Sequence, residues 1–446
     1  MSEDTNGNLY GSTFGGGSGS RGTLFRMKKD GSNYAVITNF TGGANDGGLP
    51  NHKVLVAGDG TLYCSDGFGG AGTYGLIFKI NPDGSNFTIV KQLGAGEGFF
   101  PSAALTAGSN HIIYGSTYSG GASNVGTVFR ITQDGTGFAV LHHFAPATDG
   151  GLPLGRVIEG SDGRIYGTTS DISRPVTTLF RMNADGTNYV ILHSFGGTGD
   201  GAGPQGIIES SDGLIYGTTS GGGASSLGTV FRINKDGSGY SILRSFTGGT
   251  SDGQYPYATV IEGTDGRLYG TTDAGGSSGF GTTYVLNKNG TGYSVLRHFT
   301  GGTTDGAAPS AELFQGSDGL LYGTTSAGGA GGAGTIFKLR TDGTSYGVLK
   351  HFLGGATDGA NPYYAGVIER NNSLYGVTAA GGTFNAGIIY CVNKDGTGYQ
   401  VLINLGAGST DSATPAAGLA VGADGNLYGT TAYGGTGSTL FIFRPN

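Results

Sequence analysis

A tandem repeat constrains this chain more than any other feature. The tyrosine of a Leu-Tyr-Gly-Thr-Thr-like segment recurs at intervals of 50 to 53 residues, as Tyr10, Tyr63, Tyr114, Tyr166, Tyr216, Tyr269, Tyr322, Tyr375 and Tyr428. A period that regular indicates an array of one supersecondary unit. No linker or change of composition interrupts it, so we predict one domain, residues 1–446, built from repeats of about 52 residues.

One repeat predicts four short strands. In residues 204–246 the apolar or β-branched runs cover 206–209, 214–219, 229–233 and 240–246. Asp-Gly turns join the first strand to the second and the third to the fourth, whereas the other connections are longer and rich in glycine. The tight turns therefore lie at one end of the predicted sheet, its turn side, and the long loops at the other, its loop side.

Four antiparallel strands per repeat are typical of a β-propeller blade. We predict an all-β propeller of four-stranded antiparallel blades; a parallel β-helix is the competing array. Nine second strands and nine third strands, but eight first and eight fourth strands, favour nine blades, with three strands in the first and last; eight blades are the alternative.

Composition narrows the classes of function. The 95 glycines sit mainly at the periodic turns and loops, so they do not indicate disorder. The net charge of −7 comes without a basic stripe, and no apolar run is long enough to span a membrane, so we expect neither nucleic-acid binding nor a membrane span. Cys64 and Cys391 occupy non-equivalent positions and are predicted to be free thiols. We expect a monomer.

A carboxylate recurs in the long loop between fourth and first strands. We interpret each as the cap of its own loop. A ring of Ca²⁺ sites is the alternative. Calcium needs several oxygen ligands and each loop offers one carboxylate, so no cofactor is predicted. The residues are Asp46, Asp149, Asp200, Asp252, Asp305, Asp358 and Asp411, with Glu97 in the second repeat.

Two further polar positions recur. Glu159, Glu209, Glu262 and Glu369 share a position on the first strand, where Gln315 replaces them once. We expect ion pairs with the third-strand cations Arg26, Lys79, Arg130, Arg181, Arg232, Lys338 and Arg444. Histidines near the end of fourth strands, His142, His193, His298 and His351, are expected to be solvated. No Ser-His-Asp order or metalloprotease motif stands out.

Aromatic residues that break the repeat are the candidate ligand-binding residues. Exposed aromatic rings can stack on sugars or anchor a protein partner; plugging a wide channel is the competing role. The candidates are Tyr118, Tyr255, Tyr257, Tyr363, Tyr364 and Tyr433, in a wider set that includes Phe280 and Phe384.

Three segments carry a family resemblance: Gly-Thr-Val-Phe-Arg-Ile (126–131), Asp-Gly-Arg-Leu-Tyr-Gly-Thr-Thr (265–272) and Asp-Gly-Thr-Gly-Tyr (395–399). They resemble the bacterial GloVer tandem-repeat family, the "choice-of-anchor" proteins, over essentially the whole chain. The resemblance implies an exported or surface-anchored bacterial protein without an established activity, so we expect an extracytoplasmic location. The chain itself shows no signal peptide.

We therefore expect a non-enzymatic extracytoplasmic scaffold that binds a carbohydrate or a protein. One alternative is a carbohydrate-active lyase or hydrolase with its site at the channel mouth. The other is a purely structural surface protein. Because no catalytic constellation is visible, we name no catalytic or metal-binding residue.

Overall fold

The computed structural model describes residues 176–362 without a break, and residues 2–170 and 366–443 with interruptions. Every regular element among them is a β-strand, as the repeat predicted. Within these ranges there is accordingly no helix that could cross a membrane. The chain divides into two compact units: residues 1–191, 406–414 and 420–446, and residues 192–405 and 415–419.

The first unit contains consecutive antiparallel sheets. Their strands are β1 (Ser2–Glu3), β2 (Asn8–Thr13), β3 (Thr23–Lys28) and β4 (Ala35–Asn39); β5 (Gly47–Pro50), β6 (Leu55–Val56), β7 (Leu62–Gly69), β8 (Leu76–Ile80) and β9 (Thr88–Gln92); β10 (Phe99–Pro101), β11 (Thr106–Ala107), β12 (Ile112–Ser119), β13 (Thr127–Thr132) and β14 (Ala139–His143); β15 (Ile158–Glu159), β16 (Arg164–Thr168) and β17 (Thr177–Asn183); and β42 (Ala420–Val421), β43 (Leu427–Tyr433) and β44 (Leu440–Phe443). The strands β18 (Val190–Phe195) and β41 (Ala413–Pro415) run across the unit boundaries.

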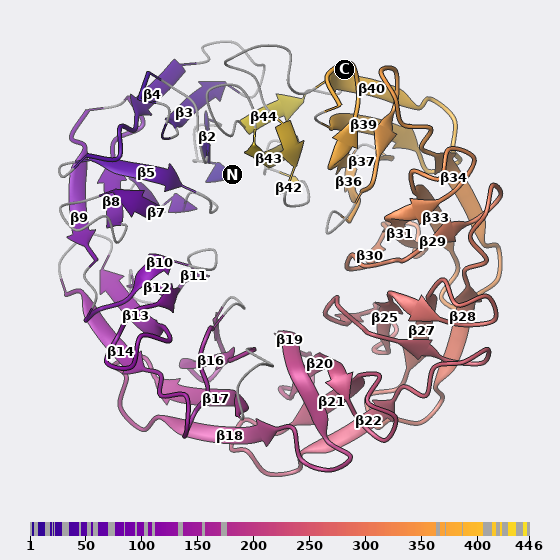
Figure 1. The fold of residues 1–446 in the computed structure, drawn as a ribbon, viewed down its shortest axis with the longest axis horizontal. Helices are drawn as coiled ribbons and strands as arrows, with labels where there is room; N and C mark the ends of the chain where they lie inside the picture. Colours follow the sequence, from indigo (N-terminus) through magenta and orange to yellow (C-terminus); the bar gives the residue numbers. More distant parts are fainter. Residues whose placement is uncertain are drawn as a thin grey trace. The chain divides into compact units, whose positions relative to one another are not determined.

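The second unit repeats one four-stranded antiparallel sheet four times in chain order (Figure 1). The sheets are β19 (Gly201–Glu209), β20 (Ile215–Gly222), β21 (Thr229–Ile233) and β22 (Ser241–Ser245); β24 (Ile261–Glu262), β25 (Leu268–Thr272), β27 (Thr282–Leu286) and β28 (Ser294–His298); β30 (Phe314–Gln315), β31 (Leu321–Thr325), β33 (Thr335–Leu339) and β34 (Gly347–His351); and β36 (Ile368–Arg370), β37 (Ser373–Thr378), β39 (Ile388–Asn393) and β40 (Gln400–Asn404).

Two-residue ladders tie the long loops together on the loop side of these sheets. They pair β23 (Gly253–Gln254) with β26 (Ala274–Gly275), β29 (Gly306–Ala307) with β32 (Ala327–Gly328), and β35 (Gly359–Ala360) with β38 (Ala380–Gly381). Each ladder joins the loop that enters a repeat to the loop that follows its second strand. The long loops are therefore held by backbone hydrogen bonds despite their glycine content.

The strand register explains the Leu-Tyr-Gly sequence of the repeat. Gly217 on β20 lies opposite Phe231 on β21. A Cβ at Gly217 would lie only 2.6 Å from the Phe231 ring, so the glycine leaves the space that the ring covers. The neighbouring Tyr216 is fully buried.

The apolar core lies between neighbouring sheets, as expected for stacked repeats. One cluster of buried residues joins Tyr216, Val230 and Phe246 to Leu268 and Tyr284 of the next repeat. Another joins Tyr269 and Phe299 to later residues of the third sheet of the unit. Each sheet is thus stabilised by burying its faces against its chain neighbours.

The terminal repeats correct one detail of the sequence prediction. The first sheet has a fourth strand, because Ser2 and Glu3 pair with Tyr10 and Leu9. The last described sheet contains β41, β42, β43 and β44. Within the first unit, β2 lies beside β43 and β44, so strands from the two ends of the chain are in contact.

Candidate functional site

The predicted aromatic residues fall into three groups. Tyr363 and Tyr364 lie outside the described residues. Tyr118 lies on β12 and Tyr433 on β43. Tyr255 and Tyr257 occur together in the loop before β24, with ring centroids 6.4 Å apart and planes 22° apart.

Tyr255 adopts a backbone conformation unusual for a large side chain, with φ of 61°. Its N–H donates to the carbonyl of Leu227 in the preceding repeat at 2.8 Å, and its carbonyl accepts from the N–H of Asp273 at 3.0 Å. Ala308 and Asn361 repeat this geometry, with φ of 56° and 57°. The left-handed residue therefore bridges two repeats, which fixes the backbone from which the nearby Tyr257 ring projects.

Large apolar side chains are exposed only at the loop side of the second unit, among its described residues. We name Tyr257, Phe280, Leu353 and Phe384 the loop-side apolar residues; they are 41%, 45%, 59% and 46% exposed. They do not occupy one position of the repeat. Their exposure is therefore not a by-product of the repeat pattern, which makes them the candidate docking residues.

The loop carboxylates bind the backbone of their own loops and also side chains outside those loops. Asp252 is 1% exposed and accepts hydrogen bonds from the N–H groups of Thr247 (2.7 Å) and Gly253 (2.9 Å), which confirms the predicted cap. It also forms an ion pair with Arg244 and accepts a hydrogen bond from the hydroxyl of Tyr293 at 2.5 Å. The Arg244 guanidinium lies 3.8 Å from the centre of the Tyr293 ring.

This aspartate–cation–tyrosine cluster recurs along the unit. Asp305 combines with Arg297 and Tyr346, and Asp358 with Lys350 and Tyr399. The tyrosine comes from the repeat that follows the loop, about 40 residues later. These partners were not predicted from the sequence, although a tyrosine recurs at the start of fourth strands and a basic residue recurs near their end.

The prediction that the histidines are solvated is wrong for two of them. His193 binds the Asp200 carboxylate at 2.7 Å and stacks on Tyr240 with centroids 3.4 Å apart; His142 pairs with Asp149 in the same way. They take the place that Arg244 has in its repeat. His298 and His351 accept loop N–H hydrogen bonds through Nδ1 from Ser277 and Ala330.

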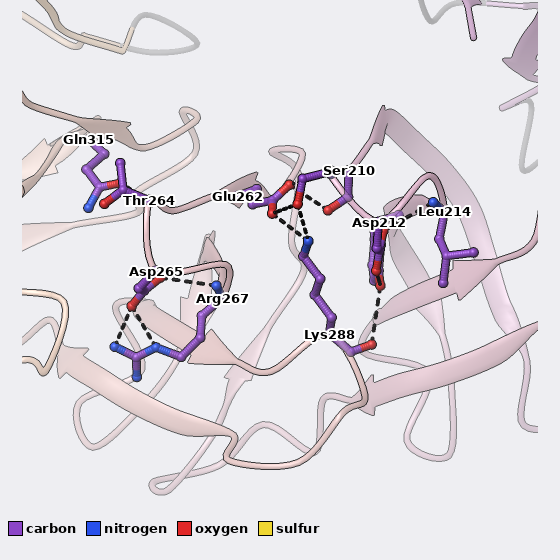
Figure 2. Close-up of polar contacts among 11 residues, drawn as sticks. Ser210, Asp212, Leu214, Glu262, Thr264, Asp265, Arg267, Lys288 and Gln315 are labelled. Atoms are coloured by element: carbon purple, nitrogen blue, oxygen red, sulfur yellow. Dashed lines mark hydrogen bonds and ion pairs between the residues drawn. The ribbon is translucent and has the colours of Figure 1, made fainter. Parts of the chain in front are cut away.

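A second cluster joins neighbouring repeats on the turn side (Figure 2). The Glu262 carboxylate accepts hydrogen bonds from Ser210 Oγ (2.6 Å), Ser211 N (2.8 Å) and Ser211 Oγ (2.5 Å) of the preceding hairpin turn. Its Oε1 also lies 2.5 Å from Nζ of Lys288. The three serine contacts tie the first strand of one repeat to the turn of the repeat before it, and Lys288 binds the glutamate from within its own repeat.

In one repeat both charged residues of this cluster are replaced together by neutral ones. Glu369 pairs with Lys394 and accepts from Ser317 N at 2.7 Å. In the intervening repeat Gln315 replaces the glutamate and accepts from Thr264 N at 2.8 Å, while Thr341 replaces the lysine. Loss of the negative charge is thus accompanied by loss of the positive charge at the same junction.

The predicted partners are therefore wrong for Glu209, Glu262 and Glu369. Glu262 pairs with a lysine of the turn between third and fourth strands, not with a third-strand cation. Arg232 of the third strand instead donates to the Lys288 carbonyl at 3.1 Å, and Lys338 donates to the Lys394 carbonyl at 2.6 Å. These two third-strand cations thus satisfy backbone carbonyls of the following repeat.

Electrostatics favour the charged forms of both clusters. Burial alone would raise the pKa of Glu262, but hydrogen bonds from Lys288, Ser210 and Ser211 outweigh burial and lower the pKa to about 2. Burial likewise opposes ionisation of Asp252, yet hydrogen bonds from Tyr293, Thr247 and Arg244 hold its pKa below the ordinary value. Neither carboxylate is poised to exchange protons near neutral pH.

The turn side carries a depression of about 450 Å³ between the sheets β30–β34 and β36–β40. It is lined by Asp318, Lys338, Asn372, Ser373, Asn393, Lys394 and Asp395. Among the described residues, no group of three or more His, Cys, Asp or Glu side chains could hold a metal ion. Cys64 and Cys391 are free thiols.

Comparison with family models gives one match. The model described as the Gloeobacter/Verrucomicrobia repeat matches residues 1–208, 159–363 and 328–446, which confirms the resemblance seen in the repeat motifs. No curated protein matches the chain.

The solved structures that match the chain share little sequence with it. An oligogalacturonate lyase in complex with manganese is 12% identical; the match covers 88% of this chain and 98% of the lyase, with a TM-score of 0.45. An inactive variant of virginiamycin B lyase from Staphylococcus aureus, with quinupristin, is 16% identical; 72% of this chain and 89% of that chain match, with a TM-score of 0.39. We transfer no activity from these proteins.

Proposed function

Because the chain belongs to the Gloeobacter/Verrucomicrobia repeat family, matched over its whole length, we propose that it is a non-enzymatic binding scaffold that docks a protein partner on its loop side. One observation carries the proposal. The repeated polar groups of the second unit bind one another, whereas the loop-side apolar residues are exposed and break the repeat.

Large apolar side chains at non-repeating positions are suited to docking. Phe280 and Phe384 each project from the loop between a second and a third strand. Buried aromatic anchors commonly contribute 2 kcal/mol or more to a protein interface, about thirtyfold in affinity. A leucine as exposed as Leu353 adds apolar area but offers no ring to stack on a sugar. The set therefore favours an apolar protein surface over a carbohydrate.

We also propose a β-propeller architecture with nine blades. The chain-ordered four-stranded sheets, the cores between neighbouring repeats and the contact of β2 with β43 support it. A reconstruction by electron microscopy that shows an open array, or eight blades, would overturn this assignment. We further propose an extracytoplasmic location, on the basis of the family resemblance; cell fractionation of the source bacterium tests it.

The docking proposal is tested with a phage-displayed random peptide library. The library is panned against the protein after depletion on a Phe280→Ser/Leu353→Ser/Phe384→Ser variant. We expect enrichment of peptides rich in aromatic and aliphatic residues, which bind at least tenfold more weakly to Phe280→Ser. Asp342→Asn, an exposed turn-side change, is the control and should bind them normally.

A glycan array run beside the panning separates the alternatives. If the enriched peptides bind the triple serine variant as well as they bind the wild type, the proposed docking site is wrong. Glycan hits that disappear in Tyr257→Ala, without any peptide enrichment, would replace the protein partner with a carbohydrate. An enzyme would be indicated if the bound glycan were cleaved.

A further inference from the structure

We propose that the turn-side depression between the sheets β30–β34 and β36–β40 binds a small, uncharged, hydroxyl-rich ligand, a unit of one or two sugars. This site is independent of the loop-side docking residues, because it lies at the other end of the strands. Its volume of about 450 Å³ falls within the ordinary range of small-molecule sites.

The depression occurs where one hairpin turn is shorter than its counterparts. In the three preceding repeats, the last paired residues are Glu209 and Ile215, Glu262 and Leu268, and Gln315 and Leu321, with five residues between them. In the fourth sheet of the unit, Glu369 pairs with Leu374 and Arg370 with Ser373. This turn is therefore one residue shorter, and it reverses direction through Asn372 at φ of 65°.

The shortened turn also lacks the aspartate that the other turns supply. Asp212, Asp265 and Asp318 each accept a hydrogen bond from the repeat tyrosine at 2.7 to 2.8 Å. The turn sequence Arg-Asn-Asn-Ser, residues 370–373, contains no carboxylate. Asn372 and Ser373, which line the depression, therefore stand where the other repeats place an Asp-Gly turn.

A third-strand lysine supplies hydrogen-bond donors at this junction. Lys338 uses one donor on the Lys394 carbonyl, and an ammonium carries three N–H groups. The Lys394 ammonium, in contrast, is surrounded by Glu369, Ser317 and Asp318 and is 8% exposed. Of the two lysines, Lys338 is thus better placed to take a new partner.

The charges that line the depression indicate an uncharged ligand. Two aspartates and two lysines give no net formal charge, so neither an anion nor a cation is favoured as a whole. Amide, hydroxyl, carboxylate and ammonium groups offer donors and acceptors on several sides. A sugar hydroxyl both donates and accepts, so a sugar can bind all of them without carrying charge. Because the lining has no aromatic ring, we expect dissociation constants of roughly 1 mM.

The test measures saturation-transfer NMR between the protein and a panel of neutral mono- and disaccharides, with free amino acids and inorganic phosphate as comparison probes. We expect signals from a subset of the sugars. Replacing residues 370–373 by Gly-Ser-Asp-Gly-Leu restores the turn of the preceding repeat. We expect this graft and Lys338→Met to weaken sugar binding at least tenfold.

Two controls keep the outcome decisive. Arg232→Met changes the equivalent third-strand cation at a junction with the longer turn and should leave sugar binding unchanged. Ser373→Ala is a mild change at the depression and should weaken binding severalfold even if the graft misfolds. No sugar signal, signals from amino acids or phosphate only, or equal binding by Lys338→Met and Ser373→Ala would each overturn the proposal. None of these outcomes bears on loop-side docking.

Discussion

Replacing Glu262 by glutamine tests the turn-side cluster most directly, because the protein already contains a glutamine at the equivalent position of the next repeat. Glu262→Gln keeps the shape of the side chain but removes the charge that faces Lys288 at 2.5 Å. At most one oxygen then remains to accept the three hydrogen bonds from Ser210 and Ser211. The variant should be less stable than the wild type.

The size of the loss follows from the contacts and the pKa. The pKa of Glu262 is about 2 against an ordinary 4.5, so ionisation contributes at most about 3 kcal/mol at neutral pH. Both side chains of the pair keep 19% exposure, and solvent screening reduces the effect. We therefore expect a loss of about 2 kcal/mol in the free energy of unfolding at pH 7.

The pH dependence has a definite sign. The pKa of Glu262 is lowered in the folded state, so its contribution is present above pH 4.5 and is lost as the pH falls towards 2. The difference between wild type and Glu262→Gln should therefore shrink across that window. Urea unfolding followed by tyrosine fluorescence is suitable, because the chain has 24 tyrosines and no tryptophan.

A double variant supplies the decisive control. Glu262→Gln/Lys288→Thr reproduces the pair of Gln315 and Thr341 found at the next junction. It no longer leaves a half-buried ammonium without its carboxylate, so we expect it to recover at least about 1 kcal/mol of the loss. If the two substitutions simply add, or if the double variant is the least stable of the set, the matched-junction argument is refuted.

Three further changes test other features of the second unit. Asp305→Asn, which removes the charge from the buried cluster, should cost about 3 kcal/mol in urea unfolding, whereas Asp342→Asn in an exposed turn should have a much smaller effect; equal losses would refute the cluster's role. His193→Arg should leave the melting temperature close to that of the wild type, because Arg244 already pairs with the equivalent aspartate in the next repeat; a large fall measured by scanning calorimetry would contradict the equivalence. Gly253→Ala should cost more than 2 kcal/mol, since its Cβ would lie 2.2 Å from Thr272 Oγ1; Gly347→Ala, which meets nothing within 4 Å, should be nearly neutral by the same measurement.

The sequence predicted the fold well because its signals are local and repeated. The tyrosine period and the Asp-Gly turns placed the strands of residues 204–246 within a few residues of β19, β20, β21 and β22. Burial between repeats followed from the same pattern, since a lone sheet leaves apolar faces uncovered. The pairing of Ser2 and Glu3 was missed because a two-residue strand carries no periodicity.

The candidate sites were predicted less completely because their partners are distant in sequence. The cap formed by Asp252 could be predicted, since its acceptors serve adjacent N–H groups. Its bond to Tyr293 could not, because 41 residues separate the two. Glu262 was assigned to the wrong cation for the same reason. The depression lies at a turn that is one residue shorter than its counterparts. This difference could be recognised only from the register of β36 with β37.

The aspartate–cation–tyrosine clusters also have a direction along the chain. Each aspartate takes its cation from a few residues earlier and its tyrosine hydroxyl from about 40 residues later. During synthesis, Arg297 is made shortly before Asp305, whereas Tyr346 is made only with the rest of the next repeat. In these three clusters a repeat is therefore completed by its successor, which supplies the tyrosine hydroxyl. Truncations from the two ends should for this reason differ in their cost. A truncation that removes the chain after a loop leaves a charged carboxylate without its tyrosine. A truncation that removes the chain before a tyrosine leaves only a neutral hydroxyl without its acceptor.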